Sequence, residues 1–269
     1  MKFDLHCHTK EGSFDSKVSI CEYINRYKEL GYDGFMITDH NSYKGCHAWH
    51  LMHRLHKFND LGEFTVLCGI EYDTKDAGHV LVILPDGIYL PILKIRGMRA
   101  KKLANIVHRH GGILGLAHPY GIPSSSAMSF KLMNEDNIKL MDFIEVFNTC
   151  EKEHSNKLAF ELARKNDMPG FAGTDAHNSQ FLGMAATEID WEIHSNNDLI
   201  RAVKAGAPIC AGGTEREETA KGKAKEMWFS QIGYKIYNRG LGKIKMPQRR
   251  YMARKLNNGH KPFCFKKAE

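Results

Sequence analysis

Two histidines near the start of the chain are the feature that most limits what this sequence can fold into. Apolar and polar residues alternate over the first residues with the period of a β-strand: Phe3 and Leu5 are apolar, and Asp4, His6 and His8 are polar. Residues two apart on a strand point to the same side, so His6 and His8 should project together. Histidine is the commonest metal ligand at neutral pH. A pair of polar residues on an exposed edge strand would show the same pattern, and the rest of the chain must separate the two interpretations.

Short apolar runs alternate with segments of helical period along the chain. Extended runs are predicted at residues 34–38, 64–70, 78–84, 113–117, 143–147 and 170–174, and helices at about 19–30, 43–59, 98–110, 154–166 and 196–205. Such alternation is typical of a parallel sheet, and six or seven repeats over this length favour a closed α/β barrel. The sequence has no Gly-x-Gly-x-x-Gly after a strand and no Gly-Lys-Ser/Thr loop, so nothing supports a nucleotide cofactor.

Metal-ligating residue types stand at one end of these runs. The predicted strands end at His6 and His8, Asp39 and His40, Glu71, His118, and Asp175 and His177, while His79 opens the run that follows Glu71. In an α/β barrel the carboxyl ends of the strands share one mouth. Each residue alone would more often be a hydrogen-bonded core residue, but together they predict a metal site. The set exceeds what one zinc ion requires, and a carboxylate such as Glu71 can bridge two cations.

These residues resemble the motifs of the PHP (polymerase and histidinol phosphatase) family. The motifs are His-Cys-His at 6–8, Thr-Asp-His at 38–40, Glu71, Ala-His-Pro at 117–119 and Thr-Asp-Ala-His at 174–177, and they cover roughly residues 1–190 in order. The resemblance implies a distorted (β/α)7 TIM-like barrel that holds up to three divalent metal ions. It also implies a hydrolase that acts on phosphoric ester bonds.

The resemblance further implies which residues hold the metals. One ion would be held by His6, His8, Glu71 and Asp175, the second by Glu71, His79 and His118, and the third by His40, His177 and a residue of the 10–16 loop. Asp15 is our choice in that loop, with Glu11 as its rival. Asp39 is expected to orient a metal-bound histidine. Mixed nitrogen and oxygen ligands suit Zn, Mn or Fe, so two or three such divalent ions are expected.

Catalytic roles are expected for three of these residues. Glu71 would bridge ions, and His177 or His40 would protonate the leaving oxygen of the substrate. Phosphate-binding cations are expected near the ends of loops at the barrel mouth, and the candidates are Lys10, Lys44, Arg96 and Arg99. Each of these cations taken singly is more often a solvated surface charge.

Charge is distributed unevenly along the chain. The formal net charge is +7, and residues 221–269 contain 14 Lys or Arg against 2 Asp or Glu, which leaves residues 1–220 with an excess of acidic groups. We expect a metal-dependent barrel over residues 1–220 and a basic C-terminal extension over residues 221–269. Phe229, Ile232 and Ile236 at helical spacing favour a helix docked on the barrel. An arm that binds nucleic acid is the alternative.

Three functional classes remain open. A phosphatase or phosphoesterase for a small phosphorylated substrate is favoured, a nuclease or nucleotide phosphodiesterase that uses the basic tail is the first alternative, and a non-catalytic, metal-stabilised binding module is the second. No run of about 18 apolar residues indicates a membrane span. Seven cysteines without a Cys-x-x-Cys pair argue against a disulfide framework and for the cytoplasm.

Overall fold

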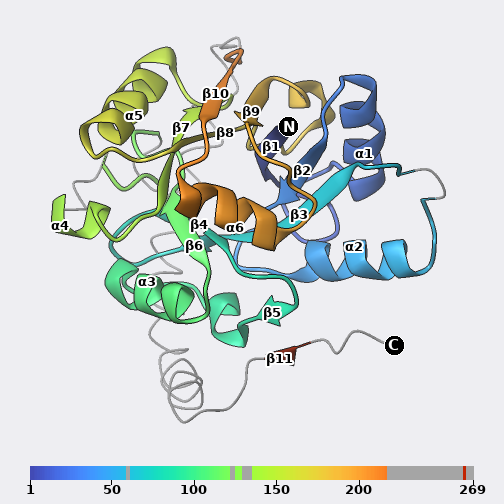
Figure 1. Cartoon of the computed structure of the whole chain (residues 1–269), viewed down its shortest axis with the longest axis horizontal. Coiled ribbons are helices and arrows are strands. Elements are labelled where there is room, and N and C mark those ends of the chain that lie inside the picture. Colours follow the sequence, from blue (N-terminus) through green and yellow to red (C-terminus); the bar gives the residue numbers. More distant parts are fainter. Residues whose placement is uncertain (59–60, 122–124, 129–134, 217–262, 265–269) are drawn as a thin grey trace.

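Residues 1–58, 61–121, 125–128, 135–216 and 263–264 are described by the computed structural model. Their largest element is a mixed sheet with the strand order β10-β9-β1-β2-β3-β4-β6-β7-β8 (Figure 1). Its strands are β1 (Lys2–Cys7), β2 (Gly34–Ile37), β3 (Thr65–Asp73), β4 (His79–Ile83), β6 (Ile113–Leu116), β7 (Phe143–Asn148), β8 (Gly170–Gly173), β9 (Ala185–Ile189) and β10 (Ile209–Gly213).

The two ends of this sheet approach each other, so that it forms a nearly closed barrel. The residues after β8 return to the end of β1, where Asp175 N donates to His6 O at 2.9 Å. Asp4 of β1 accepts from Thr174 Oγ1 at 2.5 Å, and Thr187 Oγ1 of β9 donates to Ala172 O of β8 at 2.9 Å. A backbone hydrogen bond and these side chains together therefore complete the seam that the strand ladder leaves open. The predicted distorted TIM-like barrel is confirmed.

The direction of β4 departs from the expected parallel sheet. Strands β1, β2 and β3 run parallel, as do β6, β7 and β8, but β4 is antiparallel to both β3 and β6. The connection from β3 to β4 is a tight turn in which Thr74 N donates to Gly78 O at 2.9 Å, and a turn of this length cannot return the chain for a parallel strand. The amino end of β4 consequently lies at the mouth, beside the carboxyl ends of the other strands.

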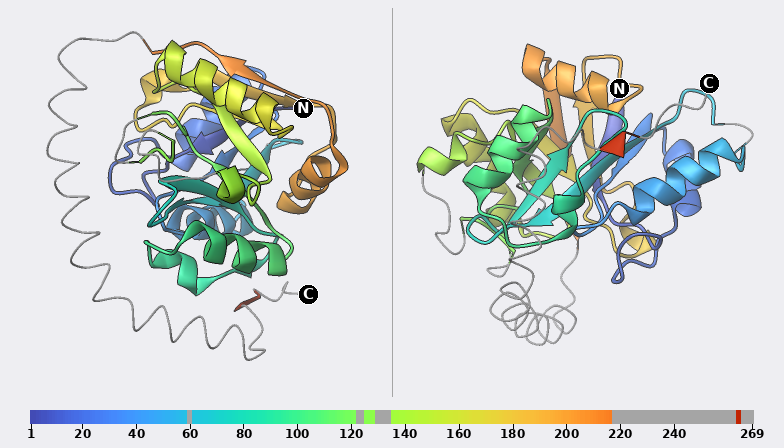
Figure 2. Two further views of the ribbon diagram at one scale, coloured as in Figure 1. Left: turned by 90° about the vertical axis from the view of Figure 1, so that its left-hand side faces the viewer. Right: turned by 90° about the horizontal axis from the view of Figure 1, so that it is seen from below.

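Helices cover the outside of the barrel and one of its ends. They are α1 (Ile20–Glu29), α2 (Lys44–Arg54), α3 (Ala100–Arg109), α4 (Glu135–Ile138), α5 (Glu153–Lys165) and α6 (Asn196–Ala205), with short 3-10 turns at Pro91–Lys94 and Ser179–Phe181. Figure 2 shows α5 and α3 on opposite sides of the strands. Leu199 and Val203 of α6 pack with the barrel-interior residues Phe3 and Phe171, so α6 closes the end away from the mouth.

The predicted helix boundaries hold except in α2. This helix was expected to continue to about residue 59, but it ends at Arg54, with Leu55 as its C-cap. His56 has a φ of 49°, and a left-handed residue ends a run of right-handed helix. The apolar stripe of α1 is buried as expected, and Ser19 caps its first turn by accepting from Glu22 N at 3.2 Å.

The basic extension lies almost entirely outside the described residues. This includes the expected boundary at residue 221 and the proposed docking stripe of Phe229, Ile232 and Ile236. Its described part is β11 (Phe263–Cys264), whose backbone pairs antiparallel with β5 (Ile88–Tyr89), Phe263 opposite Tyr89. Among the described residues, no helix is long and apolar enough to cross a membrane.

Candidate metal centre

An irregularity in β1 aims the first two histidines at one point. The register of β1 against β2 shifts between Asp4 and Cys7, and both of these residues contact Tyr27 of α1 although they are three apart. Such a bulge inserts one residue and re-aims the side chains that follow. His6 and His8 both project into the mouth, where their Nε2 atoms lie 3.2 Å apart. The simple alternation read from the sequence is therefore broken, but the expected pairing of the two histidines remains.

Glu71 at the end of β3 is the centre of the cluster. Its Oε1 atom lies 2.6 Å from His79 Nδ1 and 3.0 Å from His118 Nε2. Its Oε2 atom lies 2.6 Å from His40 Nδ1 and 3.4 Å from His8 Nε2. The side chain is only 1% exposed. One buried carboxylate thus faces histidines from four parts of the chain, which is the arrangement of a bridging ligand.

Asp175 supplies a second carboxylate beside the β1 histidines. Its Oδ1 atom lies 3.0 Å from His8 Nε2 and 3.6 Å from His6 Nε2, and His6 Nε2 is also 3.6 Å from Glu71 Oε1. A Cβ on Gly173 would overlap the His6 side chain, so β8 can approach β1 this closely only with glycine there. The structure thereby brings together the four residues that the resemblance assigned to one ion.

The partly open side of the cluster carries Asp15, His40 and His177. Asp15 Oδ2 lies 3.5 Å from His40 Nε2 and 3.4 Å from His177 Nε2, and the three side chains are 33%, 21% and 29% exposed. The rival ligand Glu11 instead faces Ile20 N at the start of α1, at 3.3 Å. Of the two candidates in the 10–16 loop, Asp15 is thus the one that lies at the cluster, on its most exposed side.

The histidines hold one ring nitrogen outside the cluster and present the other to it. The Nδ1 atoms of His8 and His118 lie 3.2 Å and 3.4 Å from the hydroxyls of Ser13 and Ser126, and His177 Nδ1 lies 2.9 Å from the backbone oxygen of Asp175. Their Nε2 atoms face the carboxylates of the cluster. A partner on one nitrogen fixes the tautomer and ring orientation of a ligating histidine.

Asp39 supports this arrangement from behind, in the position expected for it. It accepts from Ser13 Oγ at 3.0 Å and from Thr9 N at 2.7 Å, and Ser13 in turn contacts His8. Burial raises the pKa of Asp39 to about 6, against the hydrogen bonds that lower it. The carboxyl acts through Ser13 on the His8 ring.

Glu145 is a site residue that the sequence analysis missed. It lies on β7, is almost fully buried, and places Oε1 2.9 Å from His6 Nδ1 while Oε2 accepts from His118 N at 2.6 Å. Asn148 Nδ2 donates to both of its oxygens at 3.3 Å. Glu145 is a single charged residue within an apolar strand, and this could have identified it. A buried charge is costly unless it is paired, so such a residue is expected to have a partner.

Asp73 is a second missed residue, and it connects the cluster to one predicted phosphate binder. Its Oδ1 atom lies 2.7 Å from His79 Nε2, and its Oδ2 atom lies 2.9 Å from Arg96 Nε. The Arg96 side chain is 18% exposed. The other three predicted cations, Lys10, Lys44 and Arg99, are exposed, and Arg99 lies 4.0 Å from Asp76. Of the four, Arg96 is the one tied to a cluster histidine through a carboxylate.

Strained backbone accompanies these residues. Asn41, His118 and Asp175 have φ values of 46°, 28° and 50°, a region that residues other than glycine rarely adopt. Hydrogen bonds hold each of them, such as Asn41 N to Glu71 O at 2.9 Å and Asp175 N to His6 O at 2.9 Å. Strain of this kind persists where the surrounding structure over-determines it, commonly at functional sites.

The electrostatics of the cluster suit cations. Burial and the neighbouring charges of His40 and His177 lower the pKa of His8 to about 3, so this imidazole is neutral and its lone pair is available. Burial alone would raise the pKa of Glu71, but His79, His40 and His6 hold it well below its usual range. The carboxylates raise the pKa values of the other cluster histidines, so in metal-free protein these rings hold protons that bound metal ions would displace; they are His6, His40, His79, His118 and His177.

One buried atom tests whether metal ions fit. Glu71 Oε2 has no hydrogen bond although His40 Nδ1 lies 2.6 Å away, because their geometry does not direct an N–H at the oxygen. A cation bound to both atoms, at about 2.0–2.2 Å from each, would satisfy both lone pairs. In the part of the chain that the structure describes, ligand atoms within 4.8 Å of one another form five overlapping groups, among them His6, His8 and Glu71; Glu71, His79 and His118; and His8, His40 and His177. The donor set fits divalent metal ions.

The donor set of the cluster predicts the metal content of the purified protein. We expect protein purified without chelator to contain two or three transition-metal ions per chain, because Glu71 joins the first and second groups and His8 joins the first and third, while their other ligands differ. Elemental analysis by inductively coupled plasma mass spectrometry measures this. Fewer than one ion per chain, unchanged after reconstitution with Mn²⁺ or Zn²⁺, would contradict the assignment.

A pH dependence follows from His79. Burial alone would lower its pKa, but the charges of Glu71 and Asp73 raise the pKa to about 9, against 6.5 in the unfolded chain. In metal-free protein this histidine contributes fully to stability below pH 6.5 and loses its contribution as the pH rises through 9. A metal ion replaces the proton and binds better as the pH rises.

We therefore expect the rise in melting temperature caused by Mn²⁺ to grow between pH 6.5 and pH 9. Scanning calorimetry with and without Mn²⁺ at stepped pH measures the difference. A metal-induced rise that is constant or shrinks over this range would argue against proton–metal exchange at His79.

Comparisons with known proteins agree with this fold. Residues 4–156 match the family model of the PHP domain, and residues 153–208 match that of the PHP-associated family. No curated protein matches the sequence.

Several solved structures share the fold. One is a two-domain protein containing a predicted PHP-like metal-dependent phosphoesterase from Bacteroides vulgatus, with 16% identity and a TM-score of 0.59 over 80% of this chain and 65% of that one. A second is the lesion-specific endonuclease PfuEndoQ from Pyrococcus furiosus, with 19% identity and a TM-score of 0.60 over 79% of this chain and 58% of that one. A third is PsfC from Pseudomonas syringae, with 17% identity and a TM-score of 0.57 over 89% of this chain and 98% of that one. The chain thus spans about two thirds or less of the first two proteins.

Proposed function

Because the chain belongs to the PHP domain family, we propose that it is a metal-dependent phosphoesterase whose active site is the cluster around Glu71. The observation that carries this proposal is the buried Glu71 carboxylate with histidines on both of its oxygens and one oxygen without a hydrogen bond. The ions would be held by Glu71 together with six histidines and two aspartates: His6, His8, His40, His79, His118, His177, Asp15 and Asp175. Bound divalent ions would supply a hydroxide near neutral pH and neutralise phosphoryl oxygens.

The open side of the cluster indicates which side chains meet the substrate. His177 is 29% exposed, and Asp15 and Asp175 raise its pKa against the effect of burial, so the ring holds its proton more strongly than a free imidazole. Its Nδ1 faces the backbone oxygen of Asp175 at 2.9 Å, which fixes the ring with Nε2 toward the opening. In the form with two bound ions, in which His177 and His40 hold no metal, we assign His177 to protonate the leaving oxygen, with His40 as the second candidate. In the form with three ions both rings would be ligands.

A small phosphate ester is the substrate class that the site supports best. The entry side is formed by the short 10–16 loop and by two histidines, and Arg96 provides a cation whose orientation Asp73 fixes at 2.9 Å. A guanidinium in a fixed orientation suits a phosphoryl group, to which it can donate two parallel hydrogen bonds. We propose that Arg96 binds the non-reacting phosphoryl oxygens or a second phosphate of the substrate.

Nuclease activity is the second candidate. Residues 221–269 carry 12 more Lys and Arg than Asp and Glu, and the structural neighbour from Pyrococcus furiosus is an endonuclease. At 19% identity this neighbour supports the fold alone, so the charge of the tail is the observation that favours the alternative. A basic segment of this kind suits the phosphate backbone of nucleic acids.

A substrate panel tests the proposal. Protein loaded with Mn²⁺ or Zn²⁺ is assayed against sugar phosphates, mononucleotides, nucleoside bisphosphates and short single- and double-stranded oligonucleotides. We expect release of phosphate or of a phosphate monoester from at least one small substrate, abolished by chelation and restored by metal. Absence of turnover across the panel in metal-replete protein would favour the binding-module alternative.

Salt dependence separates the two enzymatic candidates. For a nuclease that uses the basic tail, log affinity for oligonucleotides falls steeply with log salt concentration, because bound phosphates release counterions. For a small-molecule phosphatase, KM changes little between about 50 and 200 mM salt. Affinity and KM measured across this range decide between them.

A further inference from the structure

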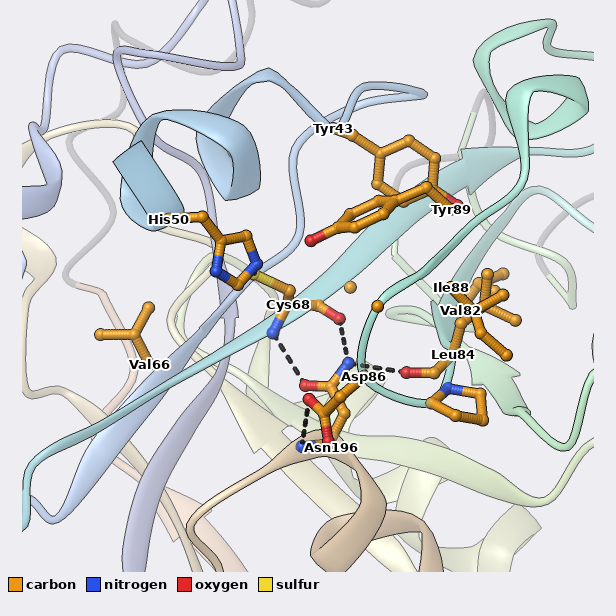
Figure 3. Close-up of a pocket in the computed structure, with 13 residues that line it drawn as sticks. Tyr43, His50, Val66, Cys68, Val82, Leu84, Asp86, Ile88, Tyr89 and Asn196 are labelled. Atoms are coloured by element: carbon orange, nitrogen blue, oxygen red, sulfur yellow. Dashed lines mark hydrogen bonds between the residues drawn. The ribbon is translucent and has the colours of Figure 1, made fainter. Parts of the chain in front are cut away.

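A cavity lies outside the metal centre, between α2, β3 and the turn that follows β4 (Figure 3). It has a volume of about 70 Å³, and its polar lining residues include Tyr43, His50, Cys68, Asp86 and Asn196. Figure 3 shows the Cys68 side chain directed toward the His50 ring, and Cys68 Sγ lies 3.8 Å from His50 Nε2. A thiol paired with an imidazole therefore lines a cavity that the proposed phosphoesterase chemistry does not use.

The backbone that presents this thiol is held in place. Asn196 at the start of α6 accepts from Cys68 N at 3.0 Å and donates to Cys68 O at 2.6 Å. The same side-chain amide donates to Leu84 O at 2.8 Å, at the end of β4. The position of Cys68 between α2 and the cavity is consequently fixed on both sides.

A second thiol stands behind the first. Cys46 in the first turns of α2 is fully buried, and its thiol donates to the backbone oxygen of Gly69, the residue that follows Cys68 on β3, at 3.8 Å. The neighbouring Cys46 thiol, together with His50, lowers the pKa of Cys68 to about 7 against the effect of burial. Burial raises the pKa of Cys46 well above its usual value. The lower pKa therefore belongs to Cys68, which faces the cavity and His50, and the higher pKa to the buried Cys46, which is the division of roles between an attacking and a resolving cysteine.

The size of the cavity limits the reagent. A water molecule needs roughly 10–15 Å³ of such volume, so the cavity holds on the order of five water-sized groups and is too small to enclose glutathione. Hydrogen peroxide satisfies this limit, and the lining offers hydrogen-bonding groups to it, including the Tyr43 hydroxyl and the His50 ring.

We propose that Cys68 is a peroxide-reactive cysteine, that the cavity admits hydrogen peroxide to it, and that Cys46 captures the product as a disulfide. The Cys68 thiolate attacks one peroxide oxygen, the S–O bond forms as the O–O bond breaks, and the leaving hydroxide takes a proton from His50 and departs as water. The Cys46 sulfur then attacks the Cys68 sulfenic acid, the S–S bond forms as the S–O bond breaks, and the Cys46 proton leaves with the hydroxyl as a second water. Two thiols are oxidised by two electrons while one peroxide is reduced to two waters.

The test uses the reduced full-length protein with stoichiometric hydrogen peroxide at pH 7, followed by alkylation and non-reducing peptide mapping by mass spectrometry. Cys21 and Cys210 are exposed and serve as internal controls in the same sample. We expect a Cys46–Cys68 disulfide to form before either control thiol is oxidised. Oxidation of Cys21 or Cys210 ahead of Cys68, or no Cys46–Cys68 peptide after complete reaction, would overturn the proposal.

Two variants separate the roles. In Cys46→Ser the sulfenic acid has no thiol partner, so a dimedone adduct on Cys68 should accumulate. In His50→Asn the pKa of Cys68 rises toward that of a free thiol, and the rate of Cys68 oxidation at pH 7 should fall about tenfold. The rate at pH 9.5 should approach that of the unsubstituted protein. An unchanged rate at pH 7 in His50→Asn would show that the imidazole does not activate the thiol.

Discussion

Replacement of Glu71 by glutamine is expected to abolish phosphoesterase activity and to remove metal from the protein. Glu71 is 1% exposed, and both of its oxygens lie within 3.0 Å of a histidine nitrogen. An amide carries no negative charge and offers one oxygen, so it cannot bridge two cations. The lost stabilisation of transition-state charge is several kcal/mol, which corresponds to a decrease in kcat of at least about 10³-fold.

The measurement pairs kcat with the metal content of the same sample. Glu22→Gln on the exposed face of α1 is the matched control, because it makes the same chemical change far from the cluster and should leave both quantities unchanged. Circular dichroism separates loss of the site from loss of the fold, since the barrel interior around Phe3, Leu81 and Phe171 does not depend on Glu71. Full activity with a full complement of metal in Glu71→Gln would refute the bridging role.

Glu145→Gln is expected to weaken metal binding although Glu145 is not assigned as a ligand. The carboxylate holds His6 Nδ1 at 2.9 Å and His118 N at 2.6 Å, and Asn148 Nδ2 already donates to both of its oxygens. Glutamine can keep one accepting oxygen but turns its amide toward a donor, so the His6 ring loses part of its orientation. Loss of an outer partner of this kind costs about 10–100-fold in metal affinity.

Metal titration monitored by calorimetry measures this effect, with Glu161→Gln on the exposed face of α5 as the control. Saturating metal should restore most of the activity of Glu145→Gln, because its ligands are intact, whereas Glu71→Gln should stay inactive. The melting temperature of the metal-free variants distinguishes a positioning role from general destabilisation. Unchanged metal affinity in Glu145→Gln would show that His6 is oriented without Glu145.

Much of the candidate site was predictable because its ligand-type residues can be recognised within short stretches of sequence. His6 and His8, Asp175 and His177, and Glu71 are ligand-type residues at the ends of apolar runs, and strand ends of an α/β barrel share one mouth. That argument needs the period of each run and the residue after it, and both can be read along the chain. The barrel itself, the division into strands and helices and the convergence of these histidines follow from it.

The remaining features depend on contacts between strands, which no single run contains. The tight turn at Thr74–Gly78 makes β4 antiparallel, and this direction brings His79 to the mouth beside Glu71. The bulge in β1 aims His6 and His8 into the cluster, and its position is set by pairing with β2.

The same reason explains the residues that were missed. Glu145 and Asp73 read as ordinary polar residues of β7 and β3, and only the packing of neighbouring strands sets them against His6 and His79. The choice of Asp15 over Glu11 likewise depends on how the 10–16 loop folds against α1. The sequence by itself determined which chemical groups stand at the strand ends, because that depends on local periodicity. The tertiary structure decided which groups orient them, because register, bulges and strand direction are set by pairing across the sheet.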